Sequence, residues 1–348
     1  MSGVPLTQPR PFAVISGAQV RRVIHGAVPD VVEVIESAYR LHGDGQTVNP
    51  DSYFLRFPDR PSSRIIALPA SVKGDVGVHG IKWIGSFPGN LTEGLPRASA
   101  VTILNDFETG YPFACLESSI ISAARTAASA VLAVSALARR RGVRPTTVGF
   151  LGTGLIARYV HTFLVDSGFT FEQVEVHDHH PAYAHDFGTY LSRSHDKTVI
   201  RTHHRAASLI RASDLVVLAT TAAEPYLTDR SWFDHNPLVL NISLRDLAPE
   251  IILTAHNVVD DVDHCLKAGT SPHLAEQRAG HRKFISGTLH DVLKGRGPIP
   301  TDRPVVFSPF GLGVLDLALA RHVYDTIAER GELRVIDEFF ADLSRYSL

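Results

Sequence analysis

The spacing of apolar residues changes along the chain, and each change indicates a different kind of structure. Residues 12–16 form a short apolar run that predicts a strand, and Ser16 and Gln19 have the spacing of a helix capping box. Two segments with helical periodicity follow, at 17–26 and 30–43. From residue 49 to 116, short apolar stretches alternate with turn residues, which predicts a mainly antiparallel sheet. Its predicted strands are 52–57, 64–69, 77–84, 98–105 and 112–116.

A long alanine-rich stretch separates this region from one with a different pattern. We predict a single helix over 119–140 that ends before Gly142 and Pro145. From residue 146 to about 293, strand-length apolar runs alternate with helical segments, which predicts a doubly wound α/β sheet. Its six predicted strands are 148–151, 174–177, 199–202, 215–219, 238–242 and 258–260. After Pro304 we predict a strand, a glycine-containing turn and a helix.

The first strand of the α/β region runs directly into the sequence GTGLIA at 152–157. Gly152 permits a tight turn, Gly154 lets the backbone approach a pyrophosphate, and Ala157 is small enough for close helix packing. The amide groups at the start of the next helix can then hold phosphates. Asp178 ends the second strand, near the offset expected for an acid that binds a ribose. This order of elements predicts a dinucleotide site, against the alternative of an ordinary glycine-rich turn.

The residue at 178 also bears on which dinucleotide is bound. A carboxylate there would repel the 2′-phosphate of NADP, and the neighbours His179 and His180 are not the arginine expected for NADP. We therefore expect NAD.

Composition limits the class of protein. The chain has 348 residues, 44% hydrophobic and 20% charged, so we expect about two soluble globular domains. A net charge of −2 argues against nucleic acid as a partner. The two cysteines lack metal or redox spacing, and the start of the chain lacks a signal pattern, so we expect a cytoplasmic protein. No apolar run reaches the length of a membrane span, so no membrane partner is expected.

Several charged residues stand in unusual surroundings. Arg125 lies in an otherwise uncharged helical stretch, where it either forms a structural salt bridge or binds a substrate carboxylate or cofactor phosphate. Lys82 lies in an alternating strand and either faces a cleft or is an ordinary solvated lysine. Asp246 follows an apolar strand, which suits either a turn or a ligand site at the strand's carboxyl end. Arg56 and Arg97 are further cations beside glycine or aromatic residues.

The 18 histidines raise the question of a metal site. His177, His179 and His180 cluster at a strand end, but no zinc-binding spacing accompanies them, so we expect no metal. His79 is a candidate acid–base group, although a histidine at the edge of a core is the commoner explanation. Thr220 and Thr221 follow another strand and suit either the cofactor path or simple turn chemistry.

The segments GIKW, RTAA, GTGLIA, VHD and NISLRD occur in an order that resembles the ornithine cyclodeaminase/mu-crystallin family over nearly the whole chain. The resemblance implies a Rossmann nucleotide domain that binds NAD, expected at 131–303. It also implies a discontinuous mixed α/β sheet domain for substrate binding and dimerisation, expected at 1–130 and 304–348. The last predicted helix would then pack on the N-terminal domain, and a homodimer is expected.

The resemblance also implies roles for individual residues. Lys82 matches a lysine that binds the substrate carboxylate, Arg125 matches an arginine that reaches substrate and cofactor, and Asp246 matches the catalytic acid. Arg56 resembles a further substrate-binding arginine, with a looser local match. Expected cofactor contacts are Gly152, Thr153, Gly154, Leu155, Ile156, Asp178, Thr220, Thr221 and Ser243.

Departures from the cyclodeaminase pattern bear on the substrate. A loop lysine is absent near Asp246 and Arg245 stands beside that acid, while Pro309 replaces a serine near the nicotinamide. Arg97 replaces a threonine-type residue. Added arginines would repel ornithine, which carries a second cation, but would suit a substrate with three carboxylates.

The resemblance therefore favours NAD-dependent oxidation and hydrolysis of N-(2-amino-2-carboxyethyl)-L-glutamate to L-2,3-diaminopropionate and 2-oxoglutarate, as in siderophore pathways of the staphyloferrin B type. The alternatives are ornithine cyclodeaminase, an imine or ketimine reductase, alanine dehydrogenase, and a non-enzymatic ligand carrier of the mu-crystallin kind.

Overall fold

The structure is a computed structural model that describes residues 11–193 and 198–340, and it divides into two compact units. The first runs to Ser122 and resumes at Gly313, and the second is Ala123–Leu312. The sequence placed these boundaries at 130/131 and 303/304. The second of these is wrong, because the strand that follows Pro304 pairs within the sheet of the second unit.

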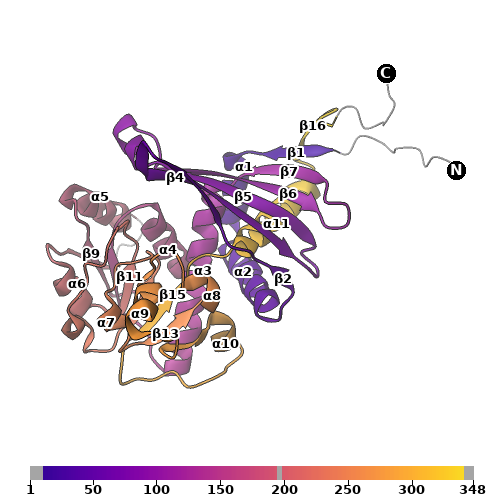
Figure 1. The fold of residues 1–348 in the computed structure, drawn as a ribbon. Helices are drawn as coiled ribbons and strands as arrows, with labels where there is room; N and C mark the ends of the chain where they lie inside the picture. Colours follow the sequence, from indigo (N-terminus) through magenta and orange to yellow (C-terminus); the bar gives the residue numbers. More distant parts are fainter. Residues whose placement is uncertain (1–10, 194–197, 341–348) are drawn as a thin grey trace. The chain divides into compact units, whose positions relative to one another are not determined.

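The first unit is built on a sheet that is mostly antiparallel (Figure 1). Over the described residues it has eight strands in the order β16-β1-β7-β6-β5-β4-β2, with β3 also paired to β4. Only the β1–β7 pair among these is parallel, so the sheet is mixed. The strands are β1 (Phe12–Ile15), β2 (Thr47–Val48), β3 (Tyr53–Phe57), β4 (Arg60–Val72), β5 (Val78–Ser86), β6 (Ala98–Asp106), β7 (Pro112–Glu117) and β16 (Arg334–Ile336).

Helices cover one face of this sheet. They are α1 (Gly17–Gly26), α2 (Val28–Gly43) and α11 (Gly313–Glu329), and a short 3-10 helix, η1 (Pro88–Glu93), follows β5. The predicted capping box of α1 is confirmed, because the Ser16 and Gln19 side chains each bond the other's backbone. The second helix begins two residues earlier than predicted, since Pro29 is tolerated in the first turn. α11 packs on β4, β5 and β6 (Figure 1), as expected for the last helix.

Two glycines let α11 approach the sheet closely. A Cβ atom on Gly80 of β5 would lie 2.3 Å from the Ile103 carbonyl oxygen and 3.0 Å from Leu317 Cδ2 of the helix. A Cβ atom on Gly313, the first residue of α11, would lie 3.3 Å from the Leu68 carbonyl oxygen. Side chains at both positions would force the helix away from the strands.

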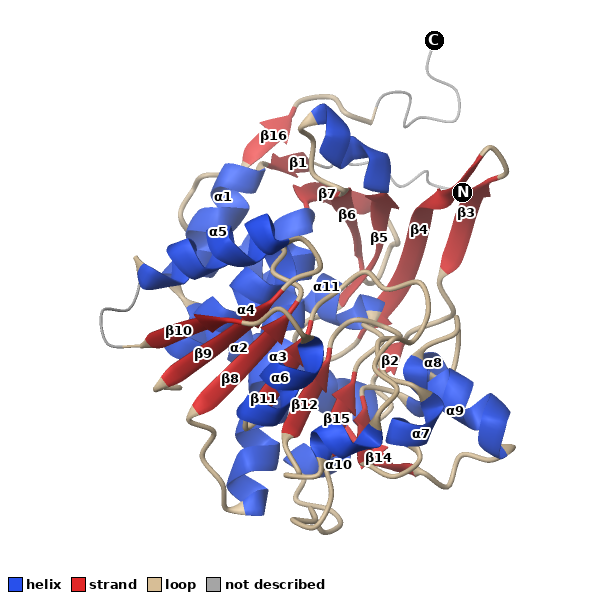
Figure 2. Cartoon of the chain, turned by 90° about the vertical axis from the view of Figure 1, so that its left-hand side faces the viewer, coloured by secondary structure: helices blue, strands red, loops and turns tan. Residues whose placement is uncertain are grey.

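The second unit is a parallel sheet flanked by helices, the doubly wound α/β class (Figure 2). Within the described residues its order is β10-β9-β8-β11-β12-β15-β13-β14, and every pair is parallel. The strands are β8 (Thr147–Leu151), β9 (Gln173–His177), β10 (Val199–Thr202), β11 (Leu215–Leu218), β12 (Leu238–Asn241), β13 (His256–Val259), β14 (Ile285–Thr288) and β15 (Val305–Ser308). The six predicted strands are therefore confirmed, and β14 and β15 extend the sheet.

The helices of this unit precede β8 or lie in the connections between its strands. They are the greater part of α3 (Ser119–Arg141), then α4 (Leu155–Asp166), α5 (Pro181–Ser192), α6 (Ala206–Ala212), α7 (Pro249–Ile252), α8 (Val262–Cys265), α9 (Ser271–Ala279) and α10 (Leu289–Leu293), with a 3-10 helix η2 (Arg230–Phe233). By length and composition α3 could cross a membrane, but most of its apolar window is buried, as in the core helix of a soluble protein. The cytoplasmic location stays a prediction.

We predict that Gly80→Ala destabilises the first unit, because its methyl group would overlap the Ile103 carbonyl oxygen. The free energy of unfolding, measured by urea denaturation, should fall by roughly 1–3 kcal/mol. Gly85→Ala on the same strand is the control, since its methyl group would lie 3.6 Å from the nearest atom, a Phe87 ring carbon. That variant should stay within about 0.5 kcal/mol of the wild type. Equal losses in both variants would contradict the close approach.

Candidate active site

The glycine-rich loop lies where the strand order of the parallel sheet reverses. From β8 the chain proceeds to β9 and β10 on one side, and β11 and β12 lie on the other. Gly152 has φ +84°, and a Cβ atom there would lie 2.6 Å from the Ala219 carbonyl oxygen that follows β11. Only glycine suits this turn. Open α/β sheets bind their ligands at this reversal, so the loop stands at the expected crevice.

The rest of the loop fits a dinucleotide. A Cβ atom on Gly154 would have no neighbour within 4 Å, so the backbone there is open to a ligand, and α4 begins at the next residue. Asp178 Oδ2 accepts bonds from the Thr153 amide at 3.0 Å and from the Thr153 hydroxyl at 2.8 Å. Asp178 Oδ1 accepts from the His180 amide at 2.9 Å. The acid predicted to bind ribose is therefore anchored directly to the glycine-rich loop.

Asp246 lies beyond the carboxyl end of β12, on the same edge of the sheet as the glycine-rich loop, and its side chain is 0% exposed. The Thr220 hydroxyl lies 2.8 and 2.9 Å from its two carboxylate oxygens. The Tyr226 hydroxyl donates to Oδ2 at 3.4 Å. Burial raises the pKa of Asp246, while hydrogen bonds from Thr220, Ser243 and Tyr226 oppose that rise. A carboxylate with a raised pKa can act as a general base closer to neutral pH.

Sequence analysis did not select Tyr226 as a site residue, because it lies in a loop without a recognisable motif. Its amide and that of Leu227 donate to the Asp246 carbonyl oxygen at 3.2 and 3.0 Å, and Leu227 and Leu247 form a parallel bridge. The loops after β11 and β12 are thus joined. Burial and the neighbouring Asp246 raise the pKa of Tyr226, so its hydroxyl keeps its proton and remains a donor.

The threonine and serine predicted as cofactor contacts lie beside this carboxylate. Thr220 bonds Asp246 directly, and the Ser243 hydroxyl donates to the Leu218 carbonyl oxygen at 3.1 Å. Thr221 is exposed next to Thr220. Their contact with a cofactor stays a prediction.

Lys82 of the first unit is not a solvated lysine. Its side chain is 2% exposed, and its ammonium lies 2.6 Å from Asp316 Oδ2 and 3.2 Å from the Ser122 hydroxyl. Sequence analysis did not select Asp316, because residue spacing gives no indication that Lys82 contacts a helix residue so far along the chain.

Arg125 lies on α3 and is half-buried rather than fully buried. Its guanidinium packs against Gly311, where a Cβ atom would lie 2.6 Å from Nη1. The Gly311 amide in turn donates to the buried carboxylate of Asp260 at 2.7 Å. Asp260 and Gly311 therefore shape the backbone surface against which Arg125 rests.

The other arginines differ in their surroundings. Arg97 is half-buried and donates to the Ser86 hydroxyl at 2.8 Å, and burial lowers the pKa of its guanidinium. Arg56 is exposed, with its guanidinium 5.1 Å from the Phe54 ring centroid. Arg245 donates to the carbonyl oxygens of Ala223 and Ala268, so it holds loops together.

Several histidines make contacts within the protein. His203 Nε2 lies 2.5 Å from Glu175 Oε2, and His177 Nδ1 bonds the His203 carbonyl oxygen at 2.9 Å. His79 contacts the Ser71 hydroxyl and the Phe107 carbonyl oxygen. Among residues 11–193 and 198–340, no three histidine, cysteine or acidic side chains are grouped so that they could hold a metal ion.

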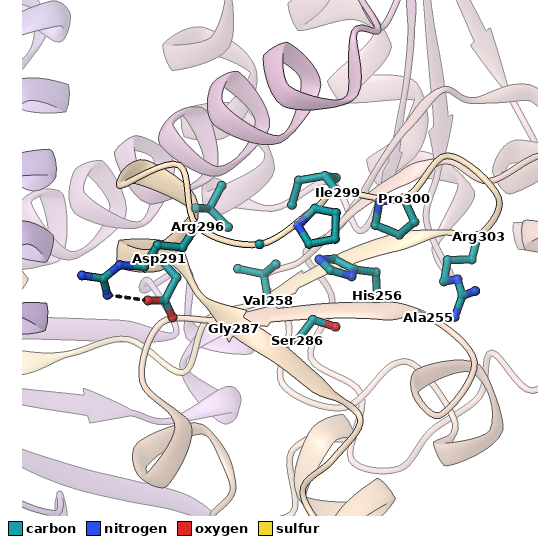
Figure 3. Close-up of a pocket in the computed structure, with 13 residues that line it drawn as sticks. Ala255, His256, Val258, Ser286, Gly287, Asp291, Arg296, Ile299, Pro300 and Arg303 are labelled. Atoms are coloured by element: carbon teal, nitrogen blue, oxygen red, sulfur yellow. Dashed lines mark hydrogen bonds and ion pairs between the residues drawn. The ribbon is translucent and has the colours of Figure 1, made fainter.

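A cavity of about 270 Å³ lies elsewhere in the second unit (Figure 3). It is lined by His256, at the amino end of β13, and by a loop that includes Pro300, while Asp291 and Arg296 pair at 3.0 Å on one side. Burial lowers the pKa of His256, and neighbouring arginine charges add to this effect. The glycine-rich loop and Asp246 follow the carboxyl ends of their strands. The cavity adjoins the amino end of β13 and is therefore separate from them.

The fold and the glycine-rich loop define a dinucleotide-binding protein of the doubly wound class. The chain belongs to the ornithine cyclodeaminase/mu-crystallin family, whose model matches residues 16–331.

Individual relatives are similar over most of their length. The chain is 29% identical to N-((2S)-2-amino-2-carboxyethyl)-L-glutamate dehydrogenase of Staphylococcus aureus, covering 84% of this chain and 88% of the relative. It is 26% identical to alanine dehydrogenase of Archaeoglobus fulgidus, covering 86% and 90%. A solved archaeal alanine dehydrogenase dimer with bound NAD has a TM-score of 0.83 at 25% identity, covering 94% of this chain and 100% of that one.

We predict that Thr220→Val raises the pKa of Asp246 further, because it removes a donor that favours the charged carboxylate. Activity that needs the carboxylate is lost as pH falls through this pKa. The acidic limb of the kcat/KM profile should therefore move to higher pH in the variant. Thr228→Val, at an exposed threonine in the same loop, is the control and should leave the profile unchanged. An unshifted acidic limb in Thr220→Val would contradict the role of this hydrogen bond.

Proposed function

We propose that this protein is an NAD-dependent amino-acid dehydrogenase that oxidises and hydrolyses N-(2-amino-2-carboxyethyl)-L-glutamate. The observation that carries the proposal is the buried carboxylate of Asp246, held by Thr220 and Tyr226 on the sheet edge that bears the glycine-rich loop. A ligand carrier would have no need of a buried base there. The similarity to the Staphylococcus aureus enzyme supports this choice of substrate.

The cofactor is NAD. Asp178 and its contacts with Thr153 favour a free ribose hydroxyl over a phosphate, and the similar archaeal alanine dehydrogenase has NAD bound. Gly152, Gly154 and the start of α4 would hold the pyrophosphate, with the predicted contacts Leu155, Ile156, Thr220, Thr221 and Ser243 around it. When bound, NAD accepts a hydride.

The proposed reaction balances with one water and one NAD. A hydride leaves the glutamyl Cα, the secondary amine loses its proton, and a C=N bond forms between them. Water adds to that carbon, and the C–N bond then breaks. The products are 2-oxoglutarate, L-2,3-diaminopropionate, NADH and a proton, and the diaminopropionate would serve siderophore or peptide natural-product biosynthesis.

Asp246 is the proposed general base. Its raised pKa and its hydrogen bonds suit a group that takes the proton of the amine or of the attacking water. The donors on its carboxylate fix its orientation, so little reorganisation is needed during the reaction.

Cations are the proposed ligands of the three substrate carboxylates. We assign this role to Lys82, Arg97 and Arg125, with Arg56 as a further candidate. Arg97 is a good candidate because burial lowers its pKa and a hydroxyl is its bonded partner, so an anion would stabilise its charge. Arg245 is a poorer candidate, because two of its nitrogens already bond carbonyl oxygens. Arg97 replaces a threonine-type residue of the cyclodeaminase pattern. This added cation favours a substrate with three carboxylates over ornithine, which carries a second cation.

The proposal is tested by mixing the protein with NAD and N-(2-amino-2-carboxyethyl)-L-glutamate. We expect a steady rise in NADH absorbance together with release of 2-oxoglutarate. Proline and ammonia formed from ornithine, without a net rise in NADH, would instead establish a cyclodeaminase. NADH formed from alanine would indicate alanine dehydrogenase, and no turnover of any amino acid or imine would leave a ligand carrier.

Variants of two arginines separate turnover from binding in the same assay. Arg125→Ala should abolish turnover in a folded protein, and near-normal activity would contradict its role. Arg97→Thr should raise the KM for the tricarboxylate with less effect on kcat, because it removes a binding contact.

We also propose a homodimer formed through the open face of the first unit's sheet. Tyr53, Trp83 and Val101 share that face by register, and Tyr53 and Trp83 are 71% and 43% exposed. Exposed apolar patches of this kind commonly mark protein interfaces. The solved archaeal alanine dehydrogenase is described as a dimer.

Trp83→Glu should convert the dimer to a monomer, because a carboxylate would be buried without a partner in the interface. Light scattering after size-exclusion chromatography measures the mass. Tyr183→Glu, at an exposed tyrosine of the second unit, is the control and should remain dimeric. A dimeric Trp83→Glu protein would exclude this face.

A further inference from the structure

We propose that Asp316 is a positioning residue for Lys82: it supplies the buried counter-charge that holds the Lys82 ammonium in place for the substrate carboxylate. The inference rests on the role of Lys82 in the proposed function. Asp316 is the last residue of the segment SPFGLGVLD at 308–316, and the proposed reaction leaves this residue without a role.

The strand register turns Lys82 towards the helix-covered face of the first unit's sheet. Leu68 and Thr102 are its direct cross-strand neighbours, and Leu116 is opposite Thr102. These three neighbours are buried, so the long lysine side chain lies among mostly apolar groups. Its ammonium meets Asp316 on α11 at 2.6 Å, where the carboxylate is 0% exposed.

Burial makes this pair interdependent. An ammonium or a carboxylate taken out of water alone is strongly unfavourable, and removing one partner leaves the other charge uncompensated. Asp316 lies in the first turn of α11, where the helix dipole also favours a negative charge. The carboxylate is therefore stabilised from two sides.

The place of Asp316 is set by the close approach of α11 to the sheet. Gly80 lies on the same strand face as Lys82 and makes room for Leu317, the residue after Asp316. Gly313 lets the start of the helix pack on Leu68. The Val314 amide donates to the Asn49 side chain at 3.3 Å, which ties the first turn to the segment before β3. The helix start is thus fixed at several points.

Ser122 completes the geometry around the ammonium. Its hydroxyl lies 3.2 Å from Lys82 Nζ, on a different element from Asp316. Two polar groups on α3 and α11 therefore set the direction of a side chain that starts on β5. A flexible lysine becomes a preorganised cation, which lowers the entropic cost of binding a carboxylate.

The experiment compares Asp316→Asn with Asp325→Asn. The first keeps the shape of the side chain and removes its charge. The second removes a carboxylate from the same helix, where it forms a partly exposed pair with Arg321. We expect Asp316→Asn to raise the KM for the amino-acid substrate by up to roughly 100-fold, the effect of a misplaced substrate contact, while the KM for NAD is unchanged. Asp325→Asn should stay within about twofold, because ion pairs that water can reach contribute little.

A cycle with Lys82→Gln shows whether Asp316 acts through the lysine. In the Lys82→Gln background, Asp316→Asn should cause no further loss of kcat/KM. Thermal unfolding provides a readout that does not depend on the substrate: each single variant removes the opposite charge from a buried ion pair, so the double variant should have a higher Tm than either. Additive losses in kcat/KM, or wild-type KM values in Asp316→Asn, would overturn the proposal.

The same measurements distinguish failure of this inference from failure of the proposed function. If the wild type turns over a different amino acid, the proposed substrate is wrong and the cycle is measured with that amino acid. If Lys82→Gln has wild-type kinetics, the role of Lys82 is wrong and the inference falls with it. If Lys82→Gln is impaired while Asp316→Asn is not, only the inference fails.

Discussion

The positions of the site residues in the nucleotide-binding unit depend on the contact between the glycine-rich loop and the end of the neighbouring strand, β11. The turn at Gly152 lies so close to the Ala219 carbonyl oxygen that there is no space for a side chain at position 152. This contact joins the loop after β8 to the loop after β11, which contains Thr220. Thr220 in turn holds Asp246 after β12. The cofactor loop and the proposed base are therefore linked through consecutive neighbours in one parallel sheet, and their relative positions follow from strand pairing.

Both units contain acidic groups that are buried and compensated in different ways. The groups that bond Asp246 are hydroxyl donors rather than a cation, and burial raises its pKa. Both features suit a group that exchanges a proton. Asp316 instead faces an ammonium at 2.6 Å, which suits a fixed counter-charge. The difference in partner thus separates a carboxylate proposed to react from one proposed only to position a neighbour.

Much of the candidate site could be predicted because its residues follow strand ends. Gly152, Asp178 and Asp246 each stand just beyond an apolar run, and parallel strands bring such positions to one edge. Tyr226 and Asp316 could not be predicted in this way. Tyr226 reaches Asp246 only because two loops pair, and Asp316 reaches Lys82 only because α11 packs on the sheet.

The sequence by itself determined the α/β class, the capped first helix, nearly all the strands and the nucleotide fingerprint, because these depend on local periodicity and short motifs. Only the tertiary structure decided that β15 joins the parallel sheet, that Lys82 is buried in an ion pair, and that Arg245 bonds loop carbonyls. The physical reason is the same in each case. Strand pairing, burial and ion pairing join residues that are distant along the chain, and local spacing carries no information about such partners.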